Sequence, residues 1–318
     1  MPAQPPRGAA ERSLGRLPGR LPGAPHAARP YLSAPVPEAL PPTPMTGSTD
    51  APLSAYEKAP SDGSALDPRC VPKTLDGEPP TGDAIVRPEY SATDERNWGF
   101  LFDRQMEMLP GRAGAAYLRG VGTLGMTSEK IPALADLSAA LERTGGWRVA
   151  RIPGLLHERD FFTLLSRRLF PSTDYIRGAD ELDYTPAPDL FHDIFGHMPM
   201  LTEPAFADFY QLFGQAALSA EGVDRQSLER LHWFAVEFGL IRDPDEIRIF
   251  GAGVLSSKDE VVHALDTAEQ RPFSVQAVIG QDYEVWHLQP ILFVLESFDQ
   301  LVSEFRTWAV GRGLLPEA

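Results

Sequence analysis

The sequence predicts a mainly α-helical domain with a few short strands, preceded by a disordered segment that is rich in proline. The prolines are unevenly divided, because 19 of the 31 lie before Ser91. From Ser91 onward, apolar side chains recur every three or four residues, which is the spacing of helices with one buried face. The chain shows no internal repeat and no regular alternation of strands with helices, which argues against a doubly wound α/β fold.

Residues 1–85 form the predicted disordered segment. They contain many Pro, Ala and Gly residues and no sustained helical or strand period, so they cannot bury enough apolar surface to offset the entropy of ordering. We expect the native chain to begin at Met45, and an intact mass that includes residues 1–44 would contradict this. Residues 86–318 are then one folded domain, large enough for an extensive core and an enclosed site.

The helices of the domain are marked by residues that start and stop them. The first follows a cap at Ser91 or Asp94 and stops at Pro110, and a later one stops at the Gly145-Gly146 pair. Residues 147–152 alternate like a short strand. Helical spacing predicts further helices over residues 113–124, 132–143, 160–170, 188–197, 203–220, 227–240, 257–265 and 293–310.

Charge and cysteine content exclude several classes of protein. Residues 86–318 carry 21 Lys/Arg against 35 Asp/Glu, and such an acidic domain repels the phosphates of nucleic acids. The single Cys70 excludes an internal disulfide and a thiolate metal cluster, which favours a cytoplasmic location. No apolar run approaches the roughly 18 residues of a membrane helix, and prolines interrupt the N-terminus where a signal peptide would lie. We expect neither nucleic acid nor membrane as a partner.

Two of the seven histidines, His192 and His197, are five residues apart. On an ideal α-helix this spacing separates two side chains by about 140° around the axis and about 7.5 Å along it, so both cannot face one ion. A local departure from the α-helix is required. Gly196 and Pro199 can supply it by loosening or ending the helix, and a π-bulge would serve equally.

Glu237 is the third candidate ligand, because it is a lone carboxylate among large apolar neighbours. A buried carboxylate needs a cation or hydrogen-bond donors. Two imidazoles and one carboxylate would fill three positions on a divalent metal and leave others open, as in the facial triad of non-heme Fe(II) enzymes. Zinc takes the same ligands with a bound water, so the residues alone leave an oxygenase and a hydrolase open. Arg177, Trp233, Phe161 and Ser256 have ordinary structural explanations when each is taken singly.

Three motifs occur together and in order. Residues 184–197 read YTPAPDLFHDIFGH, residues 233–240 read WFAVEFGL, and residues 251–257 read GAGVLSS. Together they resemble the tetrahydropterin-dependent aromatic amino acid hydroxylases, and most closely the bacterial phenylalanine 4-hydroxylases. The resemblance extends from about Trp98 to Phe298 and includes Gly146–Arg151 and Gln289-Pro290.

The resemblance implies a mostly helical catalytic domain that uses Fe(II), a tetrahydropterin and O₂ to convert L-phenylalanine to L-tyrosine. It assigns iron to His192, His197 and Glu237, with Ser256 orienting His192. The remaining implied roles concern the two organic molecules. Arg177 and Thr185 would bind the amino acid's carboxylate, Ser256 would be a further substrate-binding residue, and Trp233 would form a wall against the substrate ring. Phe161 would stack on the pterin, with Leu156 and Asp193 as further pterin contacts.

Some residues depart from the family pattern. His232 stands where a tyrosine is common, and Ala187, Met198 and Ala235 also differ, but none of these is an implied iron ligand. Hydroxylation of another ring position or of tryptophan therefore stays an alternative. Trp233 favours phenylalanine as the substrate, because tryptophan hydroxylases tend to have phenylalanine there.

Two other classes of function compete with the hydroxylase. A zinc hydrolase would use the same three ligands, although no residue is indicated as its catalytic base, and a non-catalytic binding module would retain the fold and a buried pair of histidines. Animal members of the family add a regulatory domain and a tetramer-forming helix, and neither is visible in this sequence. We therefore expect a monomer.

Overall fold

The computed structural model describes residues 67–285 and 287–317, all of which lie in one compact unit. The predicted start at Met45 and the predicted disorder of residues 1–66 lie outside the described residues. Within them, no helix combines the length and the apolar character needed to cross a bilayer.

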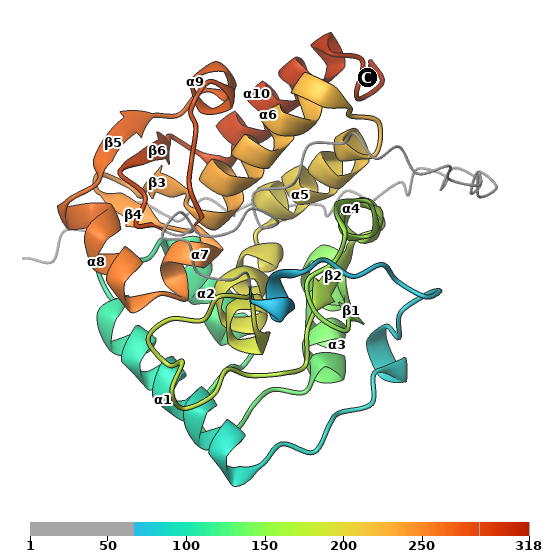
Figure 1. The fold of residues 1–318 in the computed structure, drawn as a ribbon. Coiled ribbons are helices and arrows are strands. Elements are labelled where there is room, and N and C mark those ends of the chain that lie inside the picture. The colour runs from blue at the N-terminus through green and yellow to red at the C-terminus, as the bar shows by residue number, and fades with distance from the viewer. Residues whose placement is uncertain (1–66, 286, 318) are drawn as a thin grey trace, which may run out of the picture. The chain divides into compact units, whose positions relative to one another are not determined.

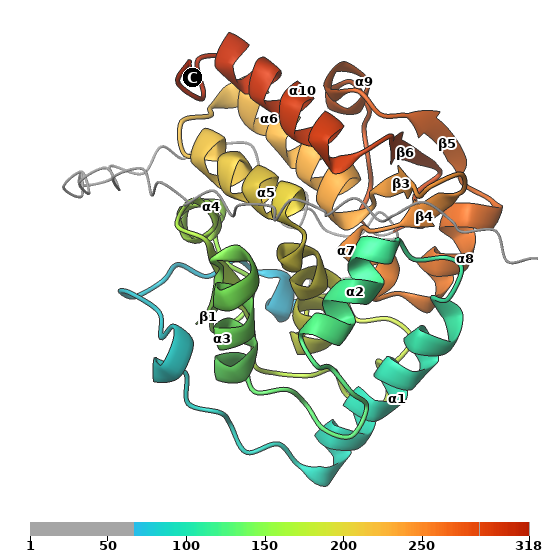
Figure 2. The same ribbon diagram turned by 180° about the vertical axis from the view of Figure 1, so that it is seen from behind.

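Helices form most of the unit, as the sequence predicts (Figures 1 and 2). The α-helices are α1 (Ala92–Met108), α2 (Ala115–Thr123), α3 (Leu134–Gly145), α4 (Glu158–Ser166), α5 (Pro204–Ala217), α6 (Gly222–His232), α7 (Ala252–Leu255), α8 (Lys258–Asp266), α9 (Val275–Ile279) and α10 (Phe298–Gly311). Short 3₁₀-helices are η2 (Pro68–Cys70), η3 (Gly82–Ala84) and η5 (Met198–Thr202), and two π-helices are η4 (His192–His197) and η6 (Trp233–Glu237).

Two small sheets accompany the helices. Strands β1 (Arg148–Arg151) and β2 (Leu169–Ser172) form a parallel pair. The larger sheet has the order β4-β3-β6-β5, built from β3 (Leu240–Arg242), β4 (Ile247–Ile249), β5 (Glu269–Pro272) and β6 (Ile291–Leu295). Helices α5, α6 and α10 run side by side next to this sheet (Figures 1 and 2).

Predicted helix signals are confirmed where capping residues are strong. Ser91 and Asp94 form a reciprocal capping box at the start of α1. Gly146 ends α3 in the left-handed conformation, with φ of 70°, which a residue with a side chain rarely adopts. The strand predicted at residues 147–152 is β1.

The predicted helix over residues 293–310 is wrong in its first part. Residues 291–295 form β6, which is buried between β3 and β5, and α10 starts only after Ser297 caps it. The sequence Ile-Leu-Phe-Val-Leu is a continuous apolar run, and such runs fit a buried parallel strand as well as a helix. The helices predicted over 160–170 and 227–240 likewise end earlier than predicted, because a strand follows each of them.

The boundary of the folded domain lies earlier than residue 86. Residues 67–85 carry η2 and η3, and Cys70 within them is fully buried. Their backbone pairs with the rest of the domain, since Lys73 bridges to Leu156 and Thr81 bridges to Ala150. The prediction of disorder is therefore wrong for residues 67–85: backbone pairing to distant residues orders a segment whose composition alone gives no sign of it.

Candidate metal centre

A π-helix brings His192 and His197 onto one face. Helix η4 spans His192–His197, and a π-helix bonds residues five apart, so its first and last residues are one turn apart. Their Nε2 atoms are 3.0 Å from each other. The structure thus selects the π-helix from the two explanations left open for the spacing, and Gly196 lies inside this turn rather than breaking it.

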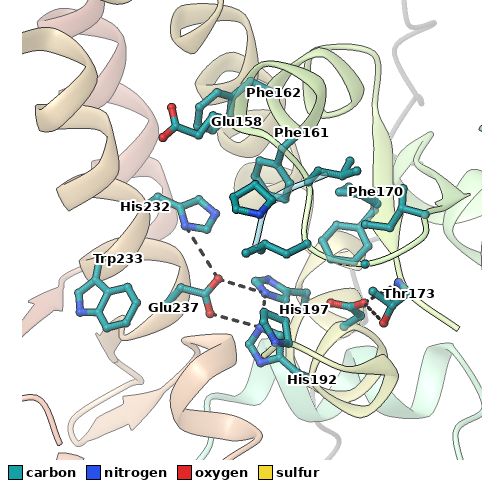
Figure 3. Close-up of a pocket in the computed structure, with 18 of the residues that line it drawn as sticks. Glu158, Phe161, Phe162, Phe170, Thr173, His192, His197, His232, Trp233 and Glu237 are labelled. Carbon is teal, nitrogen blue, oxygen red and sulfur yellow. Dashed lines mark hydrogen bonds and ion pairs between the residues drawn. The ribbon is translucent and has the colours of Figure 1, made fainter. Parts of the chain in front are cut away.

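A second π-helix, η6, delivers the carboxylate. The backbone N–H of Phe238 donates to the carbonyl of Trp233, five residues earlier, at 2.9 Å. Glu237 ends this helix with Oε1 3.2 Å from Nε2 of His197 and Oε2 3.6 Å from Nε2 of His192. Figure 3 shows the carboxylate facing both rings. The three predicted ligands therefore converge.

The donor set fits one metal ion. All three ligand atoms lie within 4.8 Å of one another. Ligands about 2.1 Å from an ion are about 3.0 Å apart at right angles and about 3.4 Å apart at a tetrahedral angle, close to the separations found here. Two imidazoles and a carboxylate suit Fe(II) or Zn(II), and the residues leave the remaining coordination positions free for other ligands.

The pKa values of the three ligands also indicate a site for a cation. Burial favours the neutral form of His197. The negative charge of Glu237 and its hydrogen bond to His197 outweigh this effect of burial and raise the pKa of His197 above its ordinary value. Burial likewise disfavours the Glu237 carboxylate, yet His197 holds its pKa far below the usual range. Burial lowers the pKa of His192 to about 4. A proton on His197 thus balances the negative charge of the Glu237 carboxylate, and a bound metal ion would balance the same charge.

Ser256 fixes the tautomer of His192. Its hydroxyl donates to the carbonyl of Ala252 at 2.8 Å, so its Oγ accepts the hydrogen of His192 Nδ1 at 3.0 Å. The Nε2 lone pair of His192 is then left for a metal ion, or for the Nε2–H of His197 at 3.0 Å. The approach of α7 that places Ser256 requires a glycine, because a Cβ on Gly251 would lie 2.5 Å from the Glu237 carbonyl oxygen.

His232 is a third imidazole, beside the two of the triad, and sequence analysis names it only as a departure from the family pattern. Its Nδ1 is 3.9 Å from Oε1 of Glu237, and its Nε2 is 3.0 Å from the hydroxyl of Tyr210. Burial lowers its pKa to about 4. Its ring also meets Phe161 edge to face, with centroids 5.7 Å apart, so it joins the metal centre to the neighbouring pocket.

Two pockets meet at the triad, and His192, Trp233 and Glu237 line both. The first, the aromatic pocket, is lined mainly by apolar side chains (Figure 3). It contains the predicted pterin residues Leu156, Phe161 and Asp193, together with Pro72, Phe162, Phe170 and Tyr283, which sequence reasoning did not indicate. Both Thr173 donors, its backbone N–H and its hydroxyl, bond to Asp193 Oδ2 at 2.7 and 3.0 Å.

The second, the polar pocket, contains the residues predicted for the amino acid. They are Arg177, Thr185 and Ser256, joined by the unpredicted Asp183, Ser257, Asp259 and Glu260. The guanidinium of Arg177 is buried, and its Nε and Nη2 bond to Asp189 at 2.9 and 2.7 Å. One edge of this guanidinium is therefore already in use, and the edge with Nη1 remains for a ligand.

Trp233 stands between the two pockets. Its indole Nε1 donates to the side chain of Gln289 at 3.0 Å, and its ring stacks on Tyr283 with centroids 4.6 Å apart. A hydrogen bond on one side and a stacked ring on another hold the indole in one orientation. Its plane is therefore fixed before any ligand binds.

The segment of residues 67–75 contacts both the loop that carries Arg177 and the aromatic pocket. Arg69 bonds to Glu181, in the loop that carries Arg177 and Thr185, at 2.8 Å, and the thiol of Cys70 donates to the carbonyl of Pro186 at 3.0 Å. Pro72 reaches the aromatic pocket. No motif marks these residues, and their role follows from contacts with residues that are distant in the sequence.

Comparison with known proteins agrees with this geometry. Residues 76–312 match the model of the family described as biopterin-dependent aromatic amino acid hydroxylase. A phenylalanine-4-hydroxylase from Ralstonia nicotianae is 44% identical over 68% of this chain and 70% of its own length.

Solved structures give the same result. A crystal structure of Chromobacterium violaceum phenylalanine hydroxylase, with bound iron(III) and 7,8-dihydrobiopterin, has a TM-score of 0.67 and 36% identity over 70% of this chain and 83% of that one. The apo structure of a cold-active phenylalanine hydroxylase from Colwellia psychrerythraea has a TM-score of 0.67 and 33% identity over 74% and 95% of the two chains. The chain with two π-helical turns around His192, His197 and Glu237 belongs to the biopterin-dependent aromatic amino acid hydroxylases.

Proposed function

We propose that this protein is a monooxygenase that hydroxylates L-phenylalanine to L-tyrosine with O₂ and a tetrahydropterin at an Fe(II) ion. One observation carries the proposal: His192, His197 and Glu237 converge where an aromatic pocket and a polar pocket meet. A pocket for a flat heterocycle and a pocket for an amino acid are what the reaction requires on either side of the metal.

The three ligands would hold Fe(II), and Ser256 would orient His192 through its hydrogen bond. When bound, the reduced pterin supplies two electrons and the iron activates O₂. The chain's own contribution is to hold the two organic molecules beside the metal and to exclude water. The buried aromatic rings around the ligands serve the second purpose.

The aromatic pocket would bind the pterin. Phe161 supplies a face for stacking, Leu156 supplies backbone groups, and Asp193 supplies a polar contact through the oxygen that Thr173 leaves free. Pro72 completes the wall. These roles are supported by the placement of all four residues around one apolar pocket.

The polar pocket would bind the amino acid. Arg177 would take the carboxylate with the edge that Asp189 leaves free, assisted by the hydroxyl of Thr185, which now donates to the carbonyl of Ala187 at 3.1 Å. Arg177 thus needs no rearrangement, because Asp189 holds its guanidinium in place. Trp233 would face the substrate ring.

The zinc hydrolase and the binding module gain no support. The family of this chain is one of hydroxylases, and the intact triad with both pockets speaks against loss of catalysis. The test is anaerobic loading with Fe(II), followed by tetrahydropterin, L-phenylalanine and O₂, with the product identified by chromatography. Tyrosine is the expected product; activity only with zinc on an ester or amide would overturn the proposal.

Substrate choice is tested at Trp233. We expect Trp233→Phe to raise the ratio of tryptophan to phenylalanine turnover several-fold, because a smaller wall admits a larger ring. The ratio is measured by competition between the two amino acids. An unchanged ratio would remove Trp233 from the substrate wall.

A monomer and a cytoplasmic location stay predictions. Light scattering of the purified protein tests the first, and a tetramer would contradict it. Fractionation of source cells tests the second.

A further inference from the structure

Glu260 is a buried carboxyl group in the polar pocket that the proposed reaction does not use. It lies in the first turn of α8 and is 7% exposed. The backbone of Gln289 favours the charged form of its carboxyl group, whereas its Oε2 has no hydrogen-bond partner among the described residues. Because a buried carboxylate that lacks a donor is costly, and because Glu260 lines the polar pocket, a cation bound in that pocket would compensate this carboxyl group.

The other carboxylates that line the described part of the polar pocket are already compensated or solvated. Asp183 is exposed and bonds to Lys258 and Arg104 at 2.9 and 2.8 Å. Asp259 is exposed to solvent. Glu237 belongs to the metal centre. Glu260 alone among them combines burial with an unsatisfied oxygen.

An α-amino acid brings two charges into this pocket. Its carboxylate has a partner in Arg177, but its ammonium group needs a negative one, and an ammonium that enters a buried pocket without a partner loses its hydration at a large cost. We propose that Glu260 binds the α-ammonium group of the amino acid substrate. The proposal rests on the function proposed above, since it takes the polar pocket as the amino acid's site.

The charge state of Glu260 supports this assignment. Burial raises its pKa to about 7, even though the backbone of Gln289 acts in the opposite direction. Burial disfavours the ionised form of Glu260 in the free protein, so a bound cation would stabilise that form strongly. An ammonium group supplies both the positive charge and the hydrogen-bond donors. Arg177 and Glu260 would then distinguish an amino acid from an aromatic acid or an aromatic amine.

The experiment removes the charge from the protein and, separately, from the ligand. Calorimetry at pH 8 measures the dissociation constants of L-phenylalanine, 2-phenylethylamine and 3-phenylpropanoate for wild type, Glu260→Gln and the control Glu107→Gln. We expect Glu260→Gln to weaken the two ligands that carry ammonium by about tenfold and to leave 3-phenylpropanoate within about twofold. Glu107→Gln makes the same change at an exposed glutamate of α1 outside both pockets and should change none of the three.

Equal weakening of all three ligands by Glu260→Gln would show a structural role and overturn the proposal, as would unchanged binding of L-phenylalanine. Thermal melting of each variant confirms that it folds. If wild type binds L-phenylalanine but makes no tyrosine, the proposed reaction fails while the comparison of ligands still decides the role of Glu260. Wild type that binds none of the three ligands would overturn both.

Discussion

The aromatic pocket and the polar pocket share His192, Trp233 and Glu237 but are built by different means. Rings of Phe161, Phe162 and their neighbours enclose the aromatic pocket, and such surfaces gain free energy from burial without directional bonds. Charged side chains line the polar pocket, and the binding energy there depends on the distances and angles of charge-assisted hydrogen bonds. A substitution in one pocket should therefore change the binding of one ligand only, whereas a substitution at the shared metal centre should affect the reaction of both ligands.

The largest effect is expected at the shared ligands. We expect His192→Ala or Glu237→Ala to lose stoichiometric iron and to reduce tyrosine formation below about 1% of wild type, with the fold retained. Metal analysis after gel filtration and far-ultraviolet circular dichroism measure the two outcomes. His157→Ala, at an exposed histidine outside the centre, is the control. Full iron content in either ligand variant would show that the assignment is wrong.

Arg177→Lys should act on the polar side alone. Lysine keeps the charge opposite the fully buried Asp189 but loses the guanidinium edge. We expect the dissociation constant of L-phenylalanine to rise about thirtyfold, while that of the tetrahydropterin stays unchanged. Calorimetry with each ligand measures both constants. A parallel loss of pterin binding would mean that the two pockets are not separable.

Phe161→Ala should act on the aromatic side alone, and less strongly. The lost stacking face should raise the dissociation constant of the tetrahydropterin about tenfold and leave that of L-phenylalanine unchanged. Phe100→Ala, at a half-exposed phenylalanine on α1, should alter neither constant. Unchanged pterin binding in Phe161→Ala would place the pterin elsewhere.

Sequence reasoning predicts the metal centre better than the walls of the pockets. His192, His197 and Glu237 lie in motifs with specific spacing, and the need for a non-α turn follows from helix geometry alone. Which departure occurs does not follow, because a π-turn and a broken helix fit the same residues. All ten predicted site residues line one or both of the two pockets.

The residues that sequence reasoning missed act through contacts between distant parts of the chain. Arg69 and Cys70 lie in a proline-rich segment without periodicity, and they are ordered by bonds to Glu181 and Pro186, more than 100 residues away. Glu260 is one of many glutamates on helices, and only burial beside the pocket sets it apart. The fold errors at residues 160–170 and 293–297 have a similar cause, since strand pairing decides between a helix and a strand in short apolar runs.

The smallest effect is expected on stability, from Glu260→Gln without any ligand. A carboxyl group with an ordinary pKa of 4.5 in the unfolded chain and about 7 in the folded protein binds its proton more tightly when folded. Its favourable contribution is therefore complete below about pH 4.5 and is lost as the pH rises through about 7. Glutamine has no proton to lose, so the variant escapes this loss.

We therefore expect Glu260→Gln to match wild type near pH 5 and to melt about 4–8 °C higher at pH 8, which corresponds to about 2 kcal/mol for a domain of this size. The control Glu107→Gln, at an exposed glutamate of α1, should show the same pH dependence of melting as wild type. Saturating L-phenylalanine should narrow the difference at pH 8, because the ammonium group would stabilise the Glu260 carboxylate that the variant lacks. A difference in melting temperature that is constant with pH would show that the Glu260 carboxyl group does not titrate in this range, and the polar pocket would then carry no unpaired charge for a ligand to satisfy.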